Sequence, residues 1–254
     1  MISERPCLVD GRPCDLGGLP DRLYVSQNIR TAGTRALHIG RHFEVLDSAS
    51  ATLLGFGVRT TPQKLSKLVS ELLDNNGYPA DSLSYITVRQ YLSGELLIAA
   101  NEIFPYRERG LRVWSPRAGI ADFEIPFSEV QSSLSESAVQ IARLGLQRGD
   151  AEVRVVLRRN VNGEIVSADG APLFIVKDGL VTAPQPAVPS AEYDAACRAV
   201  LASGLPLADG EIDTERLLDA DELFFADHRG MTAVSSCADH VYMHLLAARI
   251  AKYY

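Results

Sequence analysis

Hydrophobic and polar positions in the first half of the chain alternate in ways that predict both helices and strands. Apolar residues recur at helical spacing in residues 40–54 and 62–73, and Thr61-Pro62 is a typical helix start. Short apolar runs bounded by turn residues predict strands. These strands are residues 85–89, 95–100 and 111–114, preceded by strand-like pieces between residues 6 and 30 with a hairpin turn at Asp10-Gly11. The first half is therefore predicted to mix helices and sheet.

The second half repeats this mixture after a segment without a period. Residues 115–126 contain Pro and Gly and no sustained pattern, so they predict a linker with a domain boundary near residue 120. The helix predicted next has an apolar stripe of Leu134, Ala138, Ile141, Ala142 and Leu144. The predicted elements are strands at 152–158, 165–166, 173–176 and 222–226, hairpin turns at Asn162-Gly163 and Lys177-Asp178-Gly179, and helices at 128–146, 193–202, 214–219 and 241–253.

Charge and composition exclude several function classes. The formal net charge is −7 and no basic face is clustered, so a nucleic-acid partner is not expected. The longest apolar runs fall short of the roughly 18 residues of a membrane span, and no targeting segment precedes the first strand. The four cysteines, Cys7, Cys14, Cys197 and Cys237, form no CxxC pair, which predicts small hydrophobic residues in a reducing compartment. A cytoplasmic protein is expected.

Lysine is scarce in this chain. Of the 25 basic residues, 21 are arginine and only Lys64, Lys67, Lys177 and Lys252 are lysine. Any chemistry that requires a primary amine therefore has four candidates. No lysine lies between Lys67 and Lys177.

Several motifs in the second half agree in order and spacing with one enzyme family. They are VNGEIVSADGAPLFIVKDGLVTAP, then AVPSAEYDAACRAVLASGLPL, then ADELFFADHRGMTAV, and upstream His42 to Leu46 followed by Ser48-Ala49. This pattern resembles the fold-type IV pyridoxal-phosphate (PLP) enzymes, the class IV aminotransferases. Branched-chain aminotransferase, D-amino-acid aminotransferase and aminodeoxychorismate lyase belong to this family. The resemblance covers roughly residues 8 to 240.

The resemblance implies an α+β fold in two domains, like that of D-amino-acid aminotransferase. It implies an N-terminal α/β sandwich domain at residues 1–118 and a C-terminal pseudo-barrel domain at 119–254. By analogy it also implies a homodimer and a cleft between the domains that holds a small-molecule metabolite.

The residues that hold the cofactor in this family are not matched here. The Schiff-base lysine of the family would fall near Glu129 to Ser133, where the chain has none. The resemblance places Ser167 where the family has the glutamate that binds the pyridine nitrogen, and Val45 where it has a phosphate-binding arginine. Asp227-His228 replaces a Gly-Thr phosphate contact, and Tyr193 replaces a further arginine. Only a primary amine can hold PLP as an aldimine and exchange it with a substrate amine. No cofactor is therefore predicted.

Other candidate residues have both structural and functional interpretations. Ser167, Asp227, His228, Arg229 and Arg89 are the candidates for contact with a ligand, although Ser167 and the Asp169-Gly170 turn also fit a plain turn. His42 fits helix packing. His240 and His244 are spaced i,i+4 on a predicted helix with Cys237, Asp239 and Asp227 nearby in the sequence, but without the glutamate of a metalloprotease helix they indicate surface positions rather than a metal site.

Three hypotheses follow. The first is a family member that has lost PLP chemistry and keeps a site for a small metabolite, or serves as a catalytically silent subunit. The second is an enzyme with PLP-independent acid and base chemistry that uses His228 with Asp227 or Ser167. The third is an active aminotransferase or an aminodeoxychorismate-lyase-like enzyme with an unusual cofactor anchor.

Overall fold

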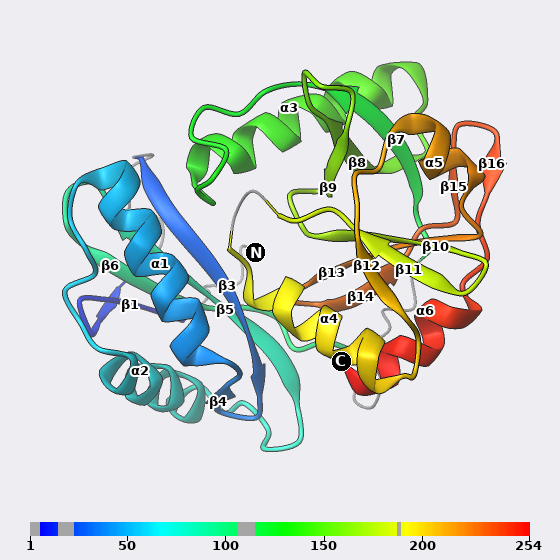
Figure 1. Ribbon diagram of the computed structural model, residues 1–254. Coiled ribbons are helices and arrows are strands. Elements are labelled where there is room, and N and C mark those ends of the chain that lie inside the picture. The colour runs from blue at the N-terminus through cyan, green and yellow to red at the C-terminus, as the bar shows by residue number, and fades with distance from the viewer. Residues whose placement is uncertain (1–5, 15–22, 106–114, 187–188) are drawn as a thin grey trace. The chain divides into compact units, whose positions relative to one another are not determined.

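The computed structural model of the chain describes residues 6–14, 23–105, 115–186 and 189–254 (Figure 1). Contacts divide it into two compact units. The first unit contains residues 1–107 and 129–134, and the second contains 108–128 and 135–254. The strand predicted at 111–114 lies outside the described residues. Both units combine helices with sheet, so the predicted α+β class is confirmed.

The first unit is built on one antiparallel sheet of six strands in the order β2-β1-β6-β5-β3-β4. The strands are β1 (Cys7–Val9), β2 (Arg12–Cys14), β3 (Tyr24–Ala32), β4 (Arg35–Ala36), β5 (Leu83–Tyr91) and β6 (Leu96–Ala100). The predicted hairpin at Asp10-Gly11 is confirmed, because φ is 49° at Asp10 and 79° at Gly11. Two consecutive residues with positive φ form the turn that matches the twist of paired strands.

Two helices of the first unit bury their apolar faces against this sheet. They are α1 (Ile39–Leu54) and α2 (Pro62–Asn75), close to the predicted bounds. Thr61 caps α2, since its hydroxyl accepts a hydrogen bond from the backbone N–H of Lys64 at 3.2 Å, and Pro62 occupies the first turn. Leu46 of α1, Leu65 of α2 and Ile86 of β5 are almost fully buried in one cluster. Burial of this common core fixes both helices.

The second unit contains two five-stranded sheets. One has the order β12-β11-β10-β13-β14 and the other β16-β15-β7-β8-β9. The strands of the first are β10 (Leu173–Lys177), β11 (Leu180–Ala183), β12 (Leu207–Asp209), β13 (Glu222–Asp227) and β14 (Gly230–Ala233). Those of the second are β7 (Arg117–Asp122), β8 (Val153–Arg159), β9 (Ile165–Ala168), β15 (Ser236–Cys237) and β16 (His240–Val241). Leu157 and Ile165 from one sheet share a core with Leu173 and Phe225 from the other.

Helices of the second unit cover the sheets. They are α3 (Ser133–Gly149), α4 (Ala191–Ala202), α5 (Thr214–Asp219) and α6 (Leu245–Ile250), which leads into a 3-10 turn (Ala251–Tyr253). Phe174 and Phe224 share a buried cluster with Val200 of α4 and Ile250 of α6. On α3 the predicted stripe is wrong, because Ile141 and Leu144 are exposed and Val139 is the buried residue. The helix packs through Val139 and through Leu146, whose side chain lies against Gly119 of β7.

Two segments of the second unit differ from the structure that the sequence predicts for them. Residues 117–122 of the predicted linker form β7, which pairs in parallel with β8 and β15, because sheet pairing satisfies backbone groups that an isolated segment would leave to water. The helix predicted at 241–253 begins only at Leu245, because His240 and Val241 pair with Cys237 and Ser236 in a short hairpin. His240 and His244 therefore do not share a helix face.

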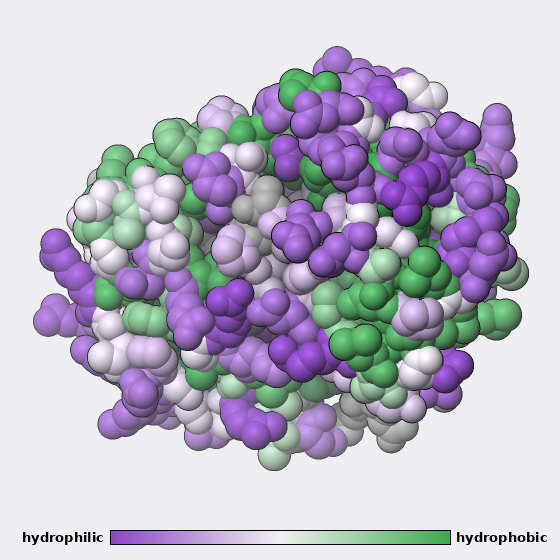
Figure 2. Space-filling view, viewed as in Figure 1, coloured by the Kyte–Doolittle hydropathy of each residue, from purple (hydrophilic) through white to green (hydrophobic). Residues whose placement is uncertain are grey.

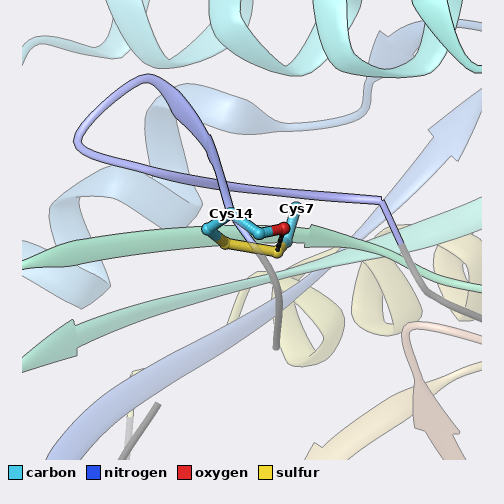
Figure 3. The surroundings of a disulfide bond; sticks show 2 residues. All are labelled: Cys7 and Cys14. Atoms are coloured by element: carbon cyan, nitrogen blue, oxygen red, sulfur yellow. Dashed lines mark hydrogen bonds between the residues drawn. A yellow bond between two sulfur atoms is a disulfide. The ribbon is translucent and has the colours of Figure 1, made fainter. Parts of the chain in front are cut away.

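The β1–β2 hairpin carries a disulfide between Cys7 and Cys14 (Figure 3). The two residues are register partners, and their Cα atoms are 5.6 Å apart, within the range that a disulfide spans. The interpretation of all four cysteines as free hydrophobic residues is thus wrong for this pair, while Cys197 and Cys237 are free. The argument for a reducing compartment loses its basis here, because disulfides persist in oxidising environments.

The surface mixes polar and apolar groups. Figure 2 shows one face on which hydrophilic side chains predominate and hydrophobic ones form separate areas. Within the described ranges, no helix combines the length and the apolar character that a membrane crossing requires.

Candidate functional site

A buried polar network in the first unit joins helix α1 to strand β3 and to the segment 129–134. His42 Nδ1 lies 2.9 Å from Gln27 Oε1, and the Gln27 amide nitrogen donates to Gln131 Oε1 at 3.3 Å and to the Ser26 carbonyl at 2.9 Å. The backbones of β3 and of the segment 129–134 are also hydrogen-bonded, since Ser26 N donates to the Gln131 carbonyl at 3.0 Å. Gln131 belongs to the segment in which the resemblance places the Schiff-base lysine. This segment is therefore anchored by amide groups.

His42 is neutral in this network. Burial, together with the charge of His38, lowers the pKa of His42 to about 4. Because the Gln27 oxygen only accepts, the proton of the neutral ring lies on Nδ1. Gln27 and Gln131 were missed by the sequence interpretation, since a single glutamine carries no spacing signal. The predicted packing and hydrogen-bonding role of His42 agrees with this geometry.

Two further positions named from the sequence lie in the first unit. Val45, at which the resemblance places a phosphate-binding arginine of the family, is buried on α1 with 4% of its surface exposed. The guanidinium carbon of Arg89, on β5, lies 4.4 Å from the centroid of the Tyr24 ring. This is the geometry of a cation–π contact.

The N-terminus of helix α4 in the second unit is capped by its own side chains. The Ser190 hydroxyl accepts from Tyr193 N at 3.2 Å and donates to Glu192 Oε2 at 2.9 Å. The carboxylate of Glu192 also binds its own backbone N–H. The free N–H groups of a helix start are an anion site. Here Ser190 and Glu192 already use part of that site.

Glu192 lies among other acids. Burial raises the pKa of Glu192 to about 7; the charges of Asp227 and Asp194 add to this rise, and its hydrogen bonds oppose it. In its ionised form this carboxylate would repel a second anion at the helix start. Glu192 was missed because the resemblance drew attention to Tyr193, where it places an arginine of the family. Tyr193 itself stacks on Phe174, with ring centroids 5.9 Å apart, and its hydroxyl donates to Asp209 Oδ1 at 3.3 Å.

The predicted ligand candidates Asp227, His228 and Arg229 lie at the turn between β13 and β14. Asp227 Oδ1 accepts from Arg229 N at 2.7 Å, and the Asp227 carbonyl accepts from the Tyr254 hydroxyl at 3.1 Å. The side chain of Asp227 thus stabilises the turn, as aspartate commonly does. Asp227 and Glu192 interact electrostatically, so the structure brings this turn close to the start of α4.

Ser167 lies on β9 opposite Arg158 of β8. Arg158 is buried, with 8% of its surface exposed, and burial lowers its pKa. The sequence analysis predicts a strand at 152–158 but gives Arg158 no role in it. A buried arginine is thus the cross-strand neighbour of Ser167, which the resemblance places at the pyridine-nitrogen position.

None of the four lysines is buried. Lys64, Lys67 and Lys252 are exposed, and Lys67 pairs with Glu71 at 3.6 Å. Lys177 Nζ donates to the Asp219 carbonyl at 2.6 Å, and its hydrogen bond to Asp219 raises its pKa. A lysine that forms a Schiff base needs the opposite shift, because only the neutral amine is nucleophilic.

Histidines and acids do not gather into a metal centre in the part of the chain that the structure describes. His240 Nε2 lies 2.9 Å from the Ala220 carbonyl, and its ring contacts Tyr242 edge-on. His244 precedes α6 as its N-cap residue.

The raised pKa of Glu192 predicts a pH dependence of stability. The folded chain holds this proton more tightly than the unfolded chain between pH 4.5 and about 7, so the free energy of unfolding falls as pH rises through that window. The loss is at most about 3 kcal/mol and is reduced by solvent screening. Glu192→Gln should flatten this fall in urea denaturation, whereas Glu211→Gln, at an exposed position, should keep it. If the free energy of unfolding fell equally steeply with pH in wild type and in Glu192→Gln, Glu192 would not be the group responsible.

The fold is that of the class IV, PLP-dependent aminotransferases. The chain is similar to the branched-chain aminotransferase of Thermoproteus uzoniensis, at 22% identity and a TM-score of 0.80, over 98% of this chain and 93% of that one. It is similar to the branched-chain aminotransferase of Escherichia coli, at 17% identity and a TM-score of 0.81, over 98% and 92% of the two chains.

A third similar structure is a fold IV-transaminase from Curtobacterium pusillum, at 15% identity and a TM-score of 0.79, over 98% of each chain. No protein-family model and no curated protein matches the sequence. The predicted fold-type IV architecture is confirmed. At these identities the likeness defines the fold alone.

Proposed function

We propose that this chain is a class IV aminotransferase-like protein that does not carry out PLP chemistry and instead binds a small metabolite. One observation carries the proposal, namely the absence of any lysine between Lys67 and Lys177. This interval contains the whole segment in which the family's Schiff-base lysine falls, so an alignment error of a few residues does not change it. When bound, PLP supplies an electron sink that depends on an aldimine with a primary amine.

The phosphate-binding positions also favour this proposal. A PLP phosphate needs N–H donors and positive charge. The start of α4 offers the carboxyl group of Glu192, whose pKa is raised to about 7 mainly by burial, and the adjacent turn offers the carboxyl group of Asp227. Val45 contributes no hydrogen bond from α1. These residues do not fit a phosphate dianion.

The ring-nitrogen position supports the same conclusion. A pyridinium needs a carboxylate partner to keep its proton. The chain has the neutral hydroxyl of Ser167, with the Arg158 guanidinium as its cross-strand neighbour. A positive charge beside a pyridinium disfavours its protonated form, so no electron sink would be maintained.

The native chain, incubated with PLP and then dialysed, should show no visible absorbance of bound cofactor. After borohydride reduction, intact mass should show no more adduct on the native chain than on the chain unfolded in urea, because exposed lysines react alike in both states. The branched-chain aminotransferase of Escherichia coli, treated in parallel, is the positive control. A stoichiometric adduct on one lysine, formed only in the native chain, would establish the alternative of an active aminotransferase or lyase with an unusual anchor.

A further inference from the structure

Strand β8 carries a buried charge that the fold does not fully compensate. Arg158 has 8% of its surface exposed. Its partner across the antiparallel pair is Ser167, and its partner on the parallel strand β7 is Ala121. Register partners in a sheet share a face. The guanidinium therefore has a hydroxyl and a methyl group as its immediate neighbours on the sheet.

The nearest carboxylate does not satisfy this guanidinium. Glu124 Oε2 lies 3.9 Å from Arg158 Nη1, which is beyond hydrogen-bond length. Glu124 is half exposed, and its other oxygen accepts from Val161 N at 2.9 Å. The Nε–H of Arg158 is buried, and it has no acceptor in the described part of the chain.

The adjacent arginine makes the contrast clear. Arg159 binds Asp122 through two hydrogen bonds, at 2.6 and 2.9 Å, and donates to the Thr214 hydroxyl at 3.1 Å. Its hydrogen bond to Asp122 raises its pKa, whereas burial lowers the pKa of Arg158. Of these two neighbouring arginines, Arg159 thus has a carboxylate at hydrogen-bonding distance, and the more deeply buried Arg158 does not.

A buried N–H group without an acceptor is costly, and an anion from outside the chain would satisfy the Nε–H of Arg158. We propose that Arg158, together with the Ser167 hydroxyl, binds the carboxylate group of a small organic acid. This inference rests on the proposed function, because it places an anion where a working aminotransferase holds a pyridinium. It identifies the class of metabolite as a carboxylic acid.

The observations favour a carboxylate over a phosphate. The planar fork of the guanidinium can bind two oxygens of a carboxylate or of a phosphate, and Nε–H with one Nη–H forms one edge of that fork. Glu124 at 3.9 Å already offsets part of the positive charge, so a single negative charge balances the site better than a phosphate dianion. The Ser167 hydroxyl supplies a further donor to the same ligand.

The test follows the Nε–H resonance of Arg158 in ¹⁵N-labelled protein during titration with benzoate at constant ionic strength. The resonance is assigned by its loss in Arg158→Gln. In wild type, the Arg158 Nε–H resonance should shift as benzoate is added and reach a limiting position at saturation. Binding, measured by calorimetry, should weaken about tenfold or more in Arg158→Gln, because a hydrogen-bonded charge pair is removed. Arg158→Lys keeps the positive charge but not the planar guanidinium. Its affinity for benzoate should lie between those of wild type and Arg158→Gln.

Arg159→Gln is the matched control, and it should change benzoate affinity by no more than about twofold, since an exposed ion pair contributes little. Movement of the Arg158 resonance with inorganic phosphate at lower concentration than with benzoate would overturn the carboxylate assignment. A resonance that does not move with either anion, or equal weakening in Arg158→Gln and Arg159→Gln, would overturn the site. The titration contains no PLP, so its failure is distinct from the appearance of a lysine adduct, which would refute the proposed function.

Discussion

Replacement of Glu222 by alanine will lower the free energy of unfolding by about 3–5 kcal/mol. Glu222 is 2% exposed, and its two carboxylate oxygens accept from Leu246 N and Ala247 N, each at 2.8 Å. These are N–H groups of the first turn of α6, which no intrahelical carbonyl can satisfy. Without the carboxylate, both donors lose their acceptor, and only apolar packing holds α6 against β13. Urea denaturation monitored by circular dichroism measures the loss.

Two variants separate this role from a general effect of removing a glutamate. Glu222→Gln keeps one acceptor oxygen and should lose about half as much free energy. Glu211→Ala, at an exposed position, should change the free energy of unfolding by less than about 0.5 kcal/mol. A loss in Glu222→Ala no larger than that in Glu211→Ala would show that the carboxylate does not hold α6.

Phe224→Ala should also lower the free energy of unfolding by about 3–5 kcal/mol, but through loss of core packing. The Phe224 ring is fully buried and stacks on Phe174, with centroids 5.0 Å apart and planes 6° apart. Truncation leaves a cavity in the cluster that joins α4 and α6 to the sheet. Thermal and urea unfolding should both report the loss.

The control for this variant is Phe127→Ala, at a position that is 51% exposed. Its effect should stay within about 0.5 kcal/mol, because little apolar area leaves the core. Phe224→Leu should recover part of the lost stability by filling most of the cavity. If Phe224→Ala were as stable as Phe127→Ala, the stacked pair would not belong to the core of this unit.

Both variants fall in the motif Ala220 to Phe224, which supported the resemblance to class IV aminotransferases. The structure explains why this motif resembles the family while other positions do not. Glu222 caps a helix, Phe224 fills the core, and Asp221 Oδ2 accepts from Asp178 N at 2.9 Å at the next hairpin. These roles stabilise the fold whether or not a cofactor is bound. The positions that differ from the family, such as Val45 and Ser167, are those expected to contact the cofactor.

The β hairpins show how much local structure the sequence specifies. Asp10-Gly11 and Lys177-Asp178-Gly179 were predicted as turns, and both have consecutive residues with positive φ. The Asp10-Gly11 turn also fixes the register that places Cys7 opposite Cys14. The disulfide was therefore within reach of the sequence, but the cysteines were examined for CxxC spacing and not for their distance from the turn.

Helix ends and long-range partners depended on tertiary contacts. The apolar run after Val241 fits a helix in isolation, yet His240 and Val241 pair with Cys237 and Ser236. Ile141 and Leu144 have helical spacing, yet α3 exposes both. Periodicity determines which face of a helix is apolar, and only the surrounding fold determines whether that face is covered.

The candidate site was predicted from the sequence only in part. The absent lysine, Val45 and Ser167 follow from one aligned pattern, because a missing residue type is visible without coordinates. The partners Gln27, Gln131, Glu192 and Arg158 were not visible, because each acts through a neighbour that is distant in sequence or on another strand.

The sequence by itself determined the α+β composition, the hairpin turns, the family pattern and the shortage of lysine. These features depend on local propensity, spacing and residue type. Only the tertiary structure decided which charges are buried and which are paired. Arg158 and Arg159 are adjacent and chemically identical, but they lie on different faces of β8, and the fold supplies a carboxylate at bonding distance to Arg159 alone. Burial and pairing arise when distant segments pack together, so no local pattern records them.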